Sequence, residues 1–590
     1  MSQLSLQARR PMNGPVELAL WACLALLWLA LELAGIARQS LLGDEQQHLL
    51  AASQALHYGT NTLNLEHPPL AKLVAGLPLL LERPLVPPLA ADQALSSAPR
   101  LFDQPAELLR SAHRGRLLVL LTFGLPWLVS LFFLGREVGG VQLGATLALG
   151  IGFAFPVLPQ LGVIHTDVVV SLGYALVLLG SLRLGRQPSR GALLCLALGL
   201  AIAVASKFTG VLLAPAVLLA LALARGERLG LARRLGAAFA LALATLAALA
   251  LTYGAANWGY RRAAGERALE LYCRGQASLV AEERLQRFEA PLLGLAHYWP
   301  GGAQFAVGLL GVAEQNRIGV YPSYALGDLR STGRWWYFPV VFALKTPLAL
   351  LVALAAALVA ALRRLRLAQI SAGELLARAR PFAPMLSLVF LYLALALSSN
   401  YNIGFRHLLP VLPILYLPAV AWAARKRWRA LALVGILALE SVALTPAWVA
   451  ATNTWWLGAA NPTRFALSGG DLDARQGFLL LGTEAERLGV EELGVLYPLL
   501  PPEELHAYLP RARAVQPGEP LRAGWYAVSA SLEQYVPALL GAPSGPLHGR
   551  EGLMELARAW QPSLEALRGG EDHGYLAGTF HLYRLPPPSG

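Results

Sequence analysis

Eleven long apolar runs constrain this 590-residue chain more than any other feature of its sequence. Each is near the roughly 20 residues that a helix needs to cross the hydrocarbon core of a bilayer. With 56% hydrophobic and only 14% charged residues, the chain cannot hide so much apolar surface in an aqueous core. The sequence therefore predicts an all-α polytopic membrane domain of about 11 transmembrane helices. The predicted spans are Val16–Ile36, Leu117–Leu134, Val141–Leu158, Val168–Leu182, Ala192–Ala205, Val211–Ala224, Leu235–Ala256, Val340–Leu362, Pro384–Ser398, Leu408–Ala424 and Ala430–Val449.

The basic residues of the loops indicate an orientation. If the N-terminus is cytoplasmic, the inside loops carry nineteen arginine and lysine residues, whereas the short outside loops carry only Lys207 and Arg406. Membrane proteins collect basic residues in their cytoplasmic loops. The net charge of +12 is therefore explained by topology, without nucleic-acid binding. We expect a multi-pass protein of the inner or plasma membrane with an extracytoplasmic C-terminus.

Three long segments then face outward and divide the chain into two domains. Outer loops at about 37–115 and 257–339 interrupt a transmembrane domain of residues 1–450, and loops of that length usually carry function. Residues 451–590 lack the long apolar runs, and we expect a small extracytoplasmic α/β domain there. Its expected elements are a helix at Arg475–Leu488 and strands at Glu492–Tyr497, Gly524–Ser529 and Thr579–Leu585.

Titratable residues gather on the predicted outer side. The first outer loop opens with Asp44, Glu45 and His48, just beyond the first span. Farther along, the paired prolines of the run Glu66–Lys72 predict an extended segment followed by a helix start. A lysine near a helix N-terminus makes an anion site together with the unpaired N–H groups. The alternatives are ordinary helix-capping acids and an interfacial lysine that reaches toward water.

Lysine is rare in this chain, with four lysines against 44 arginines. Lys72, Lys207 and Lys345 lie at the predicted outer face, and only Lys426 lies in a basic cytoplasmic loop. Lysine is a compact point charge, whereas arginine is a wide planar fork. We therefore expect positions at the outer face where an ammonium group fits and a guanidinium group does not.

These motifs resemble a known family. An Asp-Glu pair followed by a histidine, and then His-Pro-Pro-Leu-x-Lys about twenty residues later, resemble the protein O-mannosyltransferases and the related bacterial lipid A aminoarabinose transferases. These are membrane glycosyltransferases of the C-type (GT-C) fold. The chain departs from the family at Leu472–Gly477, where many relatives carry Asp-Trp-Gly-Gln-Asp. The resemblance covers about residues 15–475, and the further matching segments are Ile164–Asp167, Ser206–Gly210, Gly333–Pro339, Leu344–Pro347 and Tyr401–Pro410.

The resemblance implies inverting transfer of a sugar, most often mannose, from a polyprenyl-phosphate-linked donor to an extracytoplasmic acceptor. The acceptor is left open between a protein Ser or Thr, a lipid and a glycan. A carboxylate must take the proton of the attacking hydroxyl, and Asp44 is our choice, with Glu45 and Asp167 beside it. Cations must stabilise the leaving phosphate. The candidates for that role are Lys72, Arg406, His67, Lys207 and Arg116, and further candidates without an assigned role are His48, His165, Lys345 and His407.

No metal or other cofactor is required on this scheme, because cationic side chains neutralise the phosphate. A divalent ion between Asp44 and Asp167 remains an alternative. The expected partners are the donor lipid, the acceptor and the bilayer, and no nucleic acid. A secondary transporter is the competing hypothesis, since eleven spans would suit one. Transporters usually show inverted repeats and short outer loops, and this sequence shows no internal repeat and two long outer loops.

Overall fold

The computed structural model describes residues 15–89, 98–224, 230–274, 283–368, 373–374, 379–454, 469–541, 547, 549–576 and 578–587. Every predicted apolar run contains helix. Within the described part of the chain, six helices are long and apolar enough to cross a membrane, by length and composition. These are α2 (Pro15–Arg38), the continuous helix α5–η5–α6 (Pro105–Gly139), α8 (Thr166–Arg186), α11 (Leu231–Ala256), α17 (Leu348–Ala368) and η8–α19 (Arg380–Ser398). The other apolar runs form the shorter helices α7 (Val141–Gly152), α9 (Arg190–Ser206), η7 (Phe208–Leu212) with α10 (Leu213–Leu223), α20 (Leu412–Ala423) and α21 (Arg427–Ala443).

Several of the predicted boundaries are wrong. The run Val340–Leu362 is divided between α16 (Tyr337–Lys345) and α17, with Thr346 and Pro347 between them. Proline has no amide hydrogen to continue a helix, and it disfavours helical backbone in the residue before it. The helix of the second span begins at Pro105, well inside the loop that was expected to reach residue 115.

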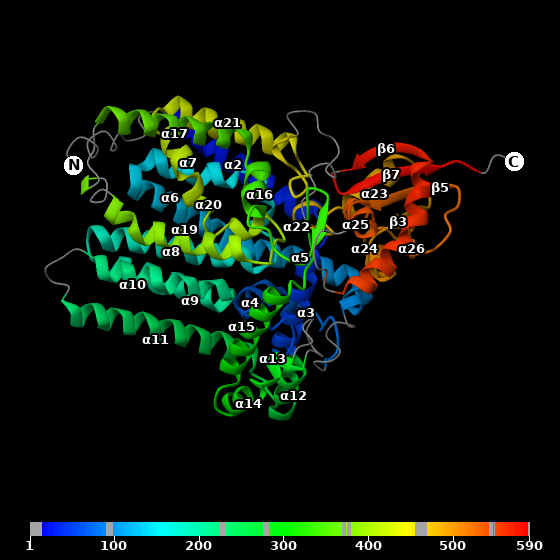
Figure 1. The fold of residues 1–590 in the computed structure, drawn as a ribbon, viewed down its shortest axis with the longest axis horizontal. Coiled ribbons are helices and arrows are strands. Elements are labelled where there is room, and N and C mark those ends of the chain that lie inside the picture. The colour runs from blue at the N-terminus through cyan, green and yellow to red at the C-terminus, as the bar shows by residue number, and fades with distance from the viewer. Residues whose placement is uncertain are drawn as a thin grey trace.

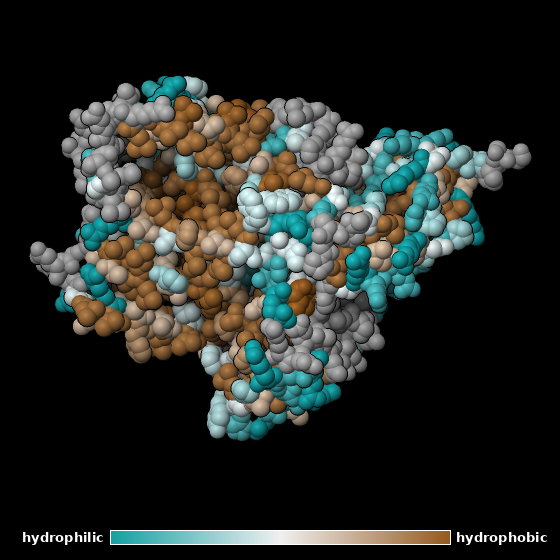
Figure 2. Space-filling model, in the orientation of Figure 1, coloured by the Kyte–Doolittle hydropathy of each residue, from teal (hydrophilic) through white to brown (hydrophobic). Residues whose placement is uncertain are grey.

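The apolar helices lie side by side and form one half of the molecule (Figure 1). On the face that Figure 2 shows, apolar residues predominate over this half. Hydrophilic residues gather on the C-terminal domain and on the lobe of α12 (Arg262–Cys273), α13 (Glu283–Gln286) and α14 (Glu289–Tyr298). This division is what a bilayer around the helices requires. The orientation remains a prediction, and several arginines on which it depends, such as Arg9 and Arg228, lie outside the described residues.

Glycine allows α8 and α9 to pack very closely. A Cβ atom added to Gly173 of α8 would lie 2.6 Å from the carbonyl oxygen of Gly199, and one added to Gly199 of α9 would lie 2.7 Å from that of Gly173. Small residues let helix backbones approach in this way inside membranes. The two helices are antiparallel neighbours, so the start of α8 and the end of α9 meet at the same end of the bundle.

The two long outer segments are largely helical and lie at the end of the bundle that adjoins the C-terminal domain (Figure 1). Gly59, at the end of α3, has a left-handed backbone with φ of 63°. A Cβ atom there would lie 2.0 Å from the amide nitrogen of Gly259. The absence of a side chain at Gly59 therefore lets the backbones of the two segments lie in contact. The first segment contains α3 (Gly43–Tyr58), α4 (Leu70–Gly76), η2 (Leu77–Leu81) and η4 (Ala98–Asp103), and the second adds α15 (Pro300–Ile318), β1 (Ser323–Ala325) and β2 (Asp328–Arg330) to the lobe.

The C-terminal domain is built on a five-stranded mixed sheet with the order β4-β3-β5-β7-β6. The two parallel pairings join β3 to β4 and to β5, and the antiparallel pairings join β7 to β5 and to β6. The predicted helix and the three predicted strands are confirmed at α23, β3, β5 and β7. The elements are α22 (Gly469–Leu472), α23 (Phe478–Arg487), β3 (Leu493–Leu496), α24 (Pro502–Tyr508), β4 (Arg513–Ala514), β5 (Gly524–Ser529), α25 (Ala530–Leu540), α26 (Arg550–Arg568), β6 (Glu571–Leu576) and β7 (Phe580–Leu585).

Candidate active site

A cavity of about 610 Å³ lies where the helical half meets the C-terminal domain. Its walls come from both outer segments, from the connections before α8, after α9 and before α20, and from the segment that leads into the C-terminal sheet. Segments far apart in the sequence therefore meet around one space. Eight of the residues predicted from the sequence line it, namely Asp44, His48, His67, His165, Asp167, Lys207, Arg406 and His407.

Two carboxylates and two cations alternate along this cavity. Asp44 stands in the first turn of α3 and forms an ion pair with Arg406, which belongs to the short helix η9 (Phe405–Leu408). Asp167 stands in the first turn of α8 and forms an ion pair with Lys207, directly after α9. Arg406 Nε also lies 3.8 Å from Asp167 Oδ2 and so connects the two pairs. The close packing of α8 on α9 brings Asp167 and Lys207 together.

The charges of this group stabilise each other. The Arg406 guanidinium holds the pKa of Asp44 well below its usual range, against the opposing effect of burial. Burial alone would lower the pKa of Arg406, but Asp44 and Asp167 outweigh it and raise that pKa. Asp44 is therefore a carboxylate and Arg406 a cation at neutral pH. Half of the side-chain surface of Asp44 remains accessible, so this carboxylate can meet a substrate.

Four histidines line the same cavity, and they are neutral. Burial lowers the pKa of His48 and of His407 to about 3, and it also lowers the pKa of His67 and of His165. His165 caps the N-terminus of α8, because its Nδ1 accepts the amide hydrogen of Asp167 at 2.9 Å while its Nε2 lies 2.8 Å from Oε1 of Gln160. These rings can give and accept hydrogen bonds, but they do not add positive charge.

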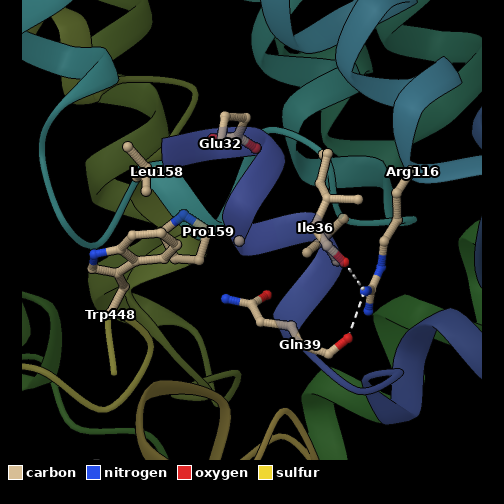
Figure 3. A pocket seen from close by; sticks show the side chains of 10 residues that line it. Glu32, Ile36, Gln39, Arg116, Leu158, Pro159 and Trp448 are labelled. Carbon is tan, nitrogen blue, oxygen red and sulfur yellow. Dashed lines mark hydrogen bonds between the residues drawn. The ribbon is translucent and has the colours of Figure 1, made fainter. Parts of the chain in front are cut away.

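Glu45 and Arg116 do not line the cavity, and they pair with each other instead. Arg116 donates to the Glu45 carboxylate at 2.8 and 2.5 Å, and to the carbonyls of Ile36, Gln39 and Ser40. Figure 3 shows the first two of these carbonyl contacts beside a small cavity. That cavity measures about 10 Å³, which is near the space of a single water molecule and too small for a phosphate. The pair is a structural link between α2, α3 and α5.

Lys72 and Lys345 are also buried away from the cavity. Lys72 is completely buried, and its Nζ donates to the carbonyls of Leu63 and Asn64 at 3.4 and 2.8 Å. It therefore supports a cavity wall from behind, since Leu63 and Asn64 line the cavity. Lys345 donates to the carbonyls of Val449 and Asp471, both at 2.6 Å, and so fastens α16 to the segments that follow α21. This placement does not support direct contact between Lys72 and a donor phosphate.

The C-terminal segment contributes a wall that the sequence did not predict. Asp473, Arg475 and Tyr497 line the cavity. The Asp473 carboxylate accepts hydrogen bonds from Tyr497 Oη at 3.1 Å and from Ser529 Oγ at 2.6 Å, while Arg475 forms an ion pair with the buried Glu504. In the sequence, this segment stood out only because it departs from the family pattern. That departure did not predict that the segment would line the cavity.

A second polar group on the cavity wall comes from Glu66, Gln315 and Tyr401. Gln315 Nε2 donates to Glu66 at 3.2 Å, and Tyr401 Oη donates to Gln315 Oε1 at 2.8 Å. Glu66 and Tyr401 stood inside recognised motifs, but their side-chain chemistry gave no reason to select them. Among the described residues, no three His, Cys, Asp or Glu side chains are arranged to hold a metal ion. The carboxylates of Asp44 and Asp167 are instead both paired with cations.

A polytopic helical domain, an α/β domain and a charged cavity at their junction define a multi-pass membrane protein with a buried polar site. No family model matches the sequence, and no curated protein matches it. Among solved structures, the chain is similar to ArnT from Cupriavidus metallidurans bound to undecaprenyl phosphate, with 13% identity and a TM-score of 0.32 over 95% of this chain and 97% of that chain. It is also similar to the apo state of that protein, with 14% identity and a TM-score of 0.31 over 96% and 97%.

Proposed function

We propose that this protein is an inverting glycosyltransferase that moves a sugar from a polyprenyl-phosphate donor to an extracytoplasmic acceptor. The observation that carries the proposal is the alternating group of Asp44, Arg406, Asp167 and Lys207 in one cavity. A base and two phosphate-binding cations are the groups that such a transfer needs. The motifs that resemble the protein O-mannosyltransferases and the aminoarabinose transferases support the class of donor.

The leaving phosphate would be held by Arg406 and Lys207. Arg406 Nε is buried and has no hydrogen-bond partner among the described residues, so a phosphate oxygen would satisfy it. The planar fork of arginine suits two oxygens, and the ammonium group of Lys207 adds a point charge. Charge that develops on the phosphate is stabilised by these fixed cations, and no general acid is needed for so good a leaving group.

Asp44 would act as the base. The acceptor oxygen attacks the anomeric carbon while the bond from that carbon to the phosphate oxygen breaks, and the hydroxyl proton passes to Asp44. In the structure, Arg406 makes Asp44 a weak base by lowering its pKa. A bound phosphate would neutralise part of the Arg406 charge, and the pKa of Asp44 would rise toward the range where a base works well. Donor binding would thus prepare Asp44 for the reaction.

The test is release of undecaprenyl phosphate by the purified protein from a panel of undecaprenyl-phosphate sugars, with an envelope extract as the source of acceptor. We expect release with at least one sugar, and loss of release in Asp44→Asn. Uptake of solute by proteoliposomes without lipid release would favour the transporter instead. Mass spectrometry of envelope proteins and lipids from a deletion strain would identify the sugar and decide between a protein, a lipid and a glycan acceptor.

A further inference from the structure

The rings of His48 and His67 form a pair that has no role in the reaction proposed above. Their centroids lie 5.2 Å apart with an angle of 39° between the planes, and both residues line the large cavity. His48 stands one helical turn after Asp44 on α3, and His67 lies in the loop before α4. The pair is therefore close to the proposed base.

Both rings have an unused polar atom. Nδ1 of His48 and Nδ1 of His67 are buried and have no hydrogen-bond partner among the described residues. His48 as a whole is only 3% exposed. Buried polar groups in folded proteins nearly always have a partner, because leaving one unpaired costs free energy. Unpaired nitrogens at the wall of a polar cavity therefore point to a ligand that supplies the missing hydrogen bonds.

The charge state of the pair restricts what that ligand can be. Burial lowers the pKa of both rings, so both are neutral. A neutral imidazole offers one N–H donor and one lone pair. A hydroxyl group also donates and accepts, so it matches such a ring. A phosphate only accepts and carries charge, so it matches Arg406 and Lys207 better. This revises the expectation that His67 binds the donor phosphate.

We propose that His48 and His67 form the subsite that binds the hydroxyl groups of the donor sugar. The inference rests on the proposed function, which fixes the two ends of the donor. With the phosphate at Arg406 and the anomeric carbon within reach of the acceptor oxygen at Asp44, the sugar ring must extend from there along the cavity wall. His48 lies one turn along the same helix.

The experiment compares two ligands that differ only in the sugar. Dissociation constants are measured in one detergent for undecaprenyl phosphate and for the undecaprenyl-phosphate sugar that the wild type binds most tightly. We expect His48→Phe and His67→Phe each to weaken binding of the sugar-bearing lipid at least tenfold and to leave binding of undecaprenyl phosphate within twofold. His48→Asn, which keeps a neutral donor and acceptor, should recover part of the loss. His57→Phe, at the other end of α3 and outside the cavity lining, should change neither constant.

The outcomes separate this inference from the proposed function. Equal weakening of both lipids in variants that unfold at the wild-type temperature would place the histidines at the phosphate and overturn the inference. Unchanged binding of both lipids would also overturn it, while the wild type still releases undecaprenyl phosphate and the proposed function stands. A folded wild type that binds neither lipid would overturn the proposed function, and this inference with it.

Discussion

Asp44 and Glu45 are neighbours in the sequence, and the structure predicts that their amide variants fail in different ways. The Glu45 carboxylate is completely buried and accepts hydrogen bonds from the amides of Leu42 and Ile164 at 2.9 and 3.0 Å. It also forms a two-bond ion pair with Arg116. Glu45→Gln keeps the size of the side chain but leaves the Arg116 charge buried without its counter-charge.

The expected magnitudes follow from burial. Removing one partner of a buried ion pair destabilises a protein by about 3–5 kcal/mol, because the other charge is left uncompensated. We expect a loss of that size for Glu45→Gln. Asp44 is half accessible, and Asp167 remains 3.8 Å from Arg406 as a second counter-charge, so Asp44→Asn should destabilise the protein less than Glu45→Gln does. The turnover of Asp44→Asn should fall by roughly 10²–10⁴, the usual contribution of a general base.

Acid pH offers a second measure of the same difference. Burial raises the pKa of Glu45, but the Arg116 charge and the hydrogen bonds outweigh it and lower that pKa below its ordinary value of 4.5. A group with a depressed pKa stabilises the folded state above its unfolded pKa, and the contribution is lost as the pH falls through the folded pKa. The free energy of unfolding of the wild type should therefore fall between neutral and acid pH. In Glu45→Gln this fall should be smaller, because the variant has no carboxylate at this position to protonate.

The assay is chemical unfolding of both variants in one detergent, together with release of undecaprenyl phosphate per folded molecule. Wild-type stability with lost turnover in Glu45→Gln would refute the reasoning and return Glu45 to the catalytic group. Wild-type turnover in Asp44→Asn would move the base to Asp167.

Four further predictions concern positions other than Asp44, Arg406, Asp167 and Lys207. Lys72→Arg should lower kcat/KM at least tenfold, about 1.4 kcal/mol, because the wider guanidinium group does not fit a completely buried position. Lys426→Arg, in a loop that is predicted to be cytoplasmic, should leave the same assay unchanged. Burial lowers the pKa of Lys72 from 10.5 to about 7. The free energy of unfolding should therefore rise with pH between these two values. In Lys72→Met, which has no group to titrate there, this rise should be absent from a plot of the free energy of unfolding against pH. Gly173→Ala should lower turnover by separating α8 from α9, while Gly191→Ala, where a Cβ atom meets nothing within 4 Å, should fold and act normally in the same measurements. A reporter that works only outside the cytoplasm should be active when it is fused after Gly590. Activity at that position of a reporter that works only in the cytoplasm would reverse the predicted orientation.

The sequence by itself determined the features that depend on local pattern. Apolar length predicted helix in each of the eleven apolar runs, because a span in lipid must satisfy its backbone hydrogen bonds within its own segment. It did not predict the helices of the two long outer segments. Alternation of apolar and polar residues predicted β3, β5 and β7 of the C-terminal domain. The strands β4 and β6 were missed, since two-residue and exposed edge strands carry little such pattern.

Only the tertiary structure decided which charged residues work together. Neighbouring residues on a helix point about 100° apart, since 3.6 residues complete a turn, so Asp44 faces the cavity while Glu45 faces Arg116 in the protein interior. The sequence gives no measure of that rotation. Asp167 and Lys207 meet because two glycines let α8 and α9 approach each other, and Arg475 reaches the cavity because the C-terminal domain docks there. These contacts join segments that the chain separates widely, and no local pattern records which of them will meet.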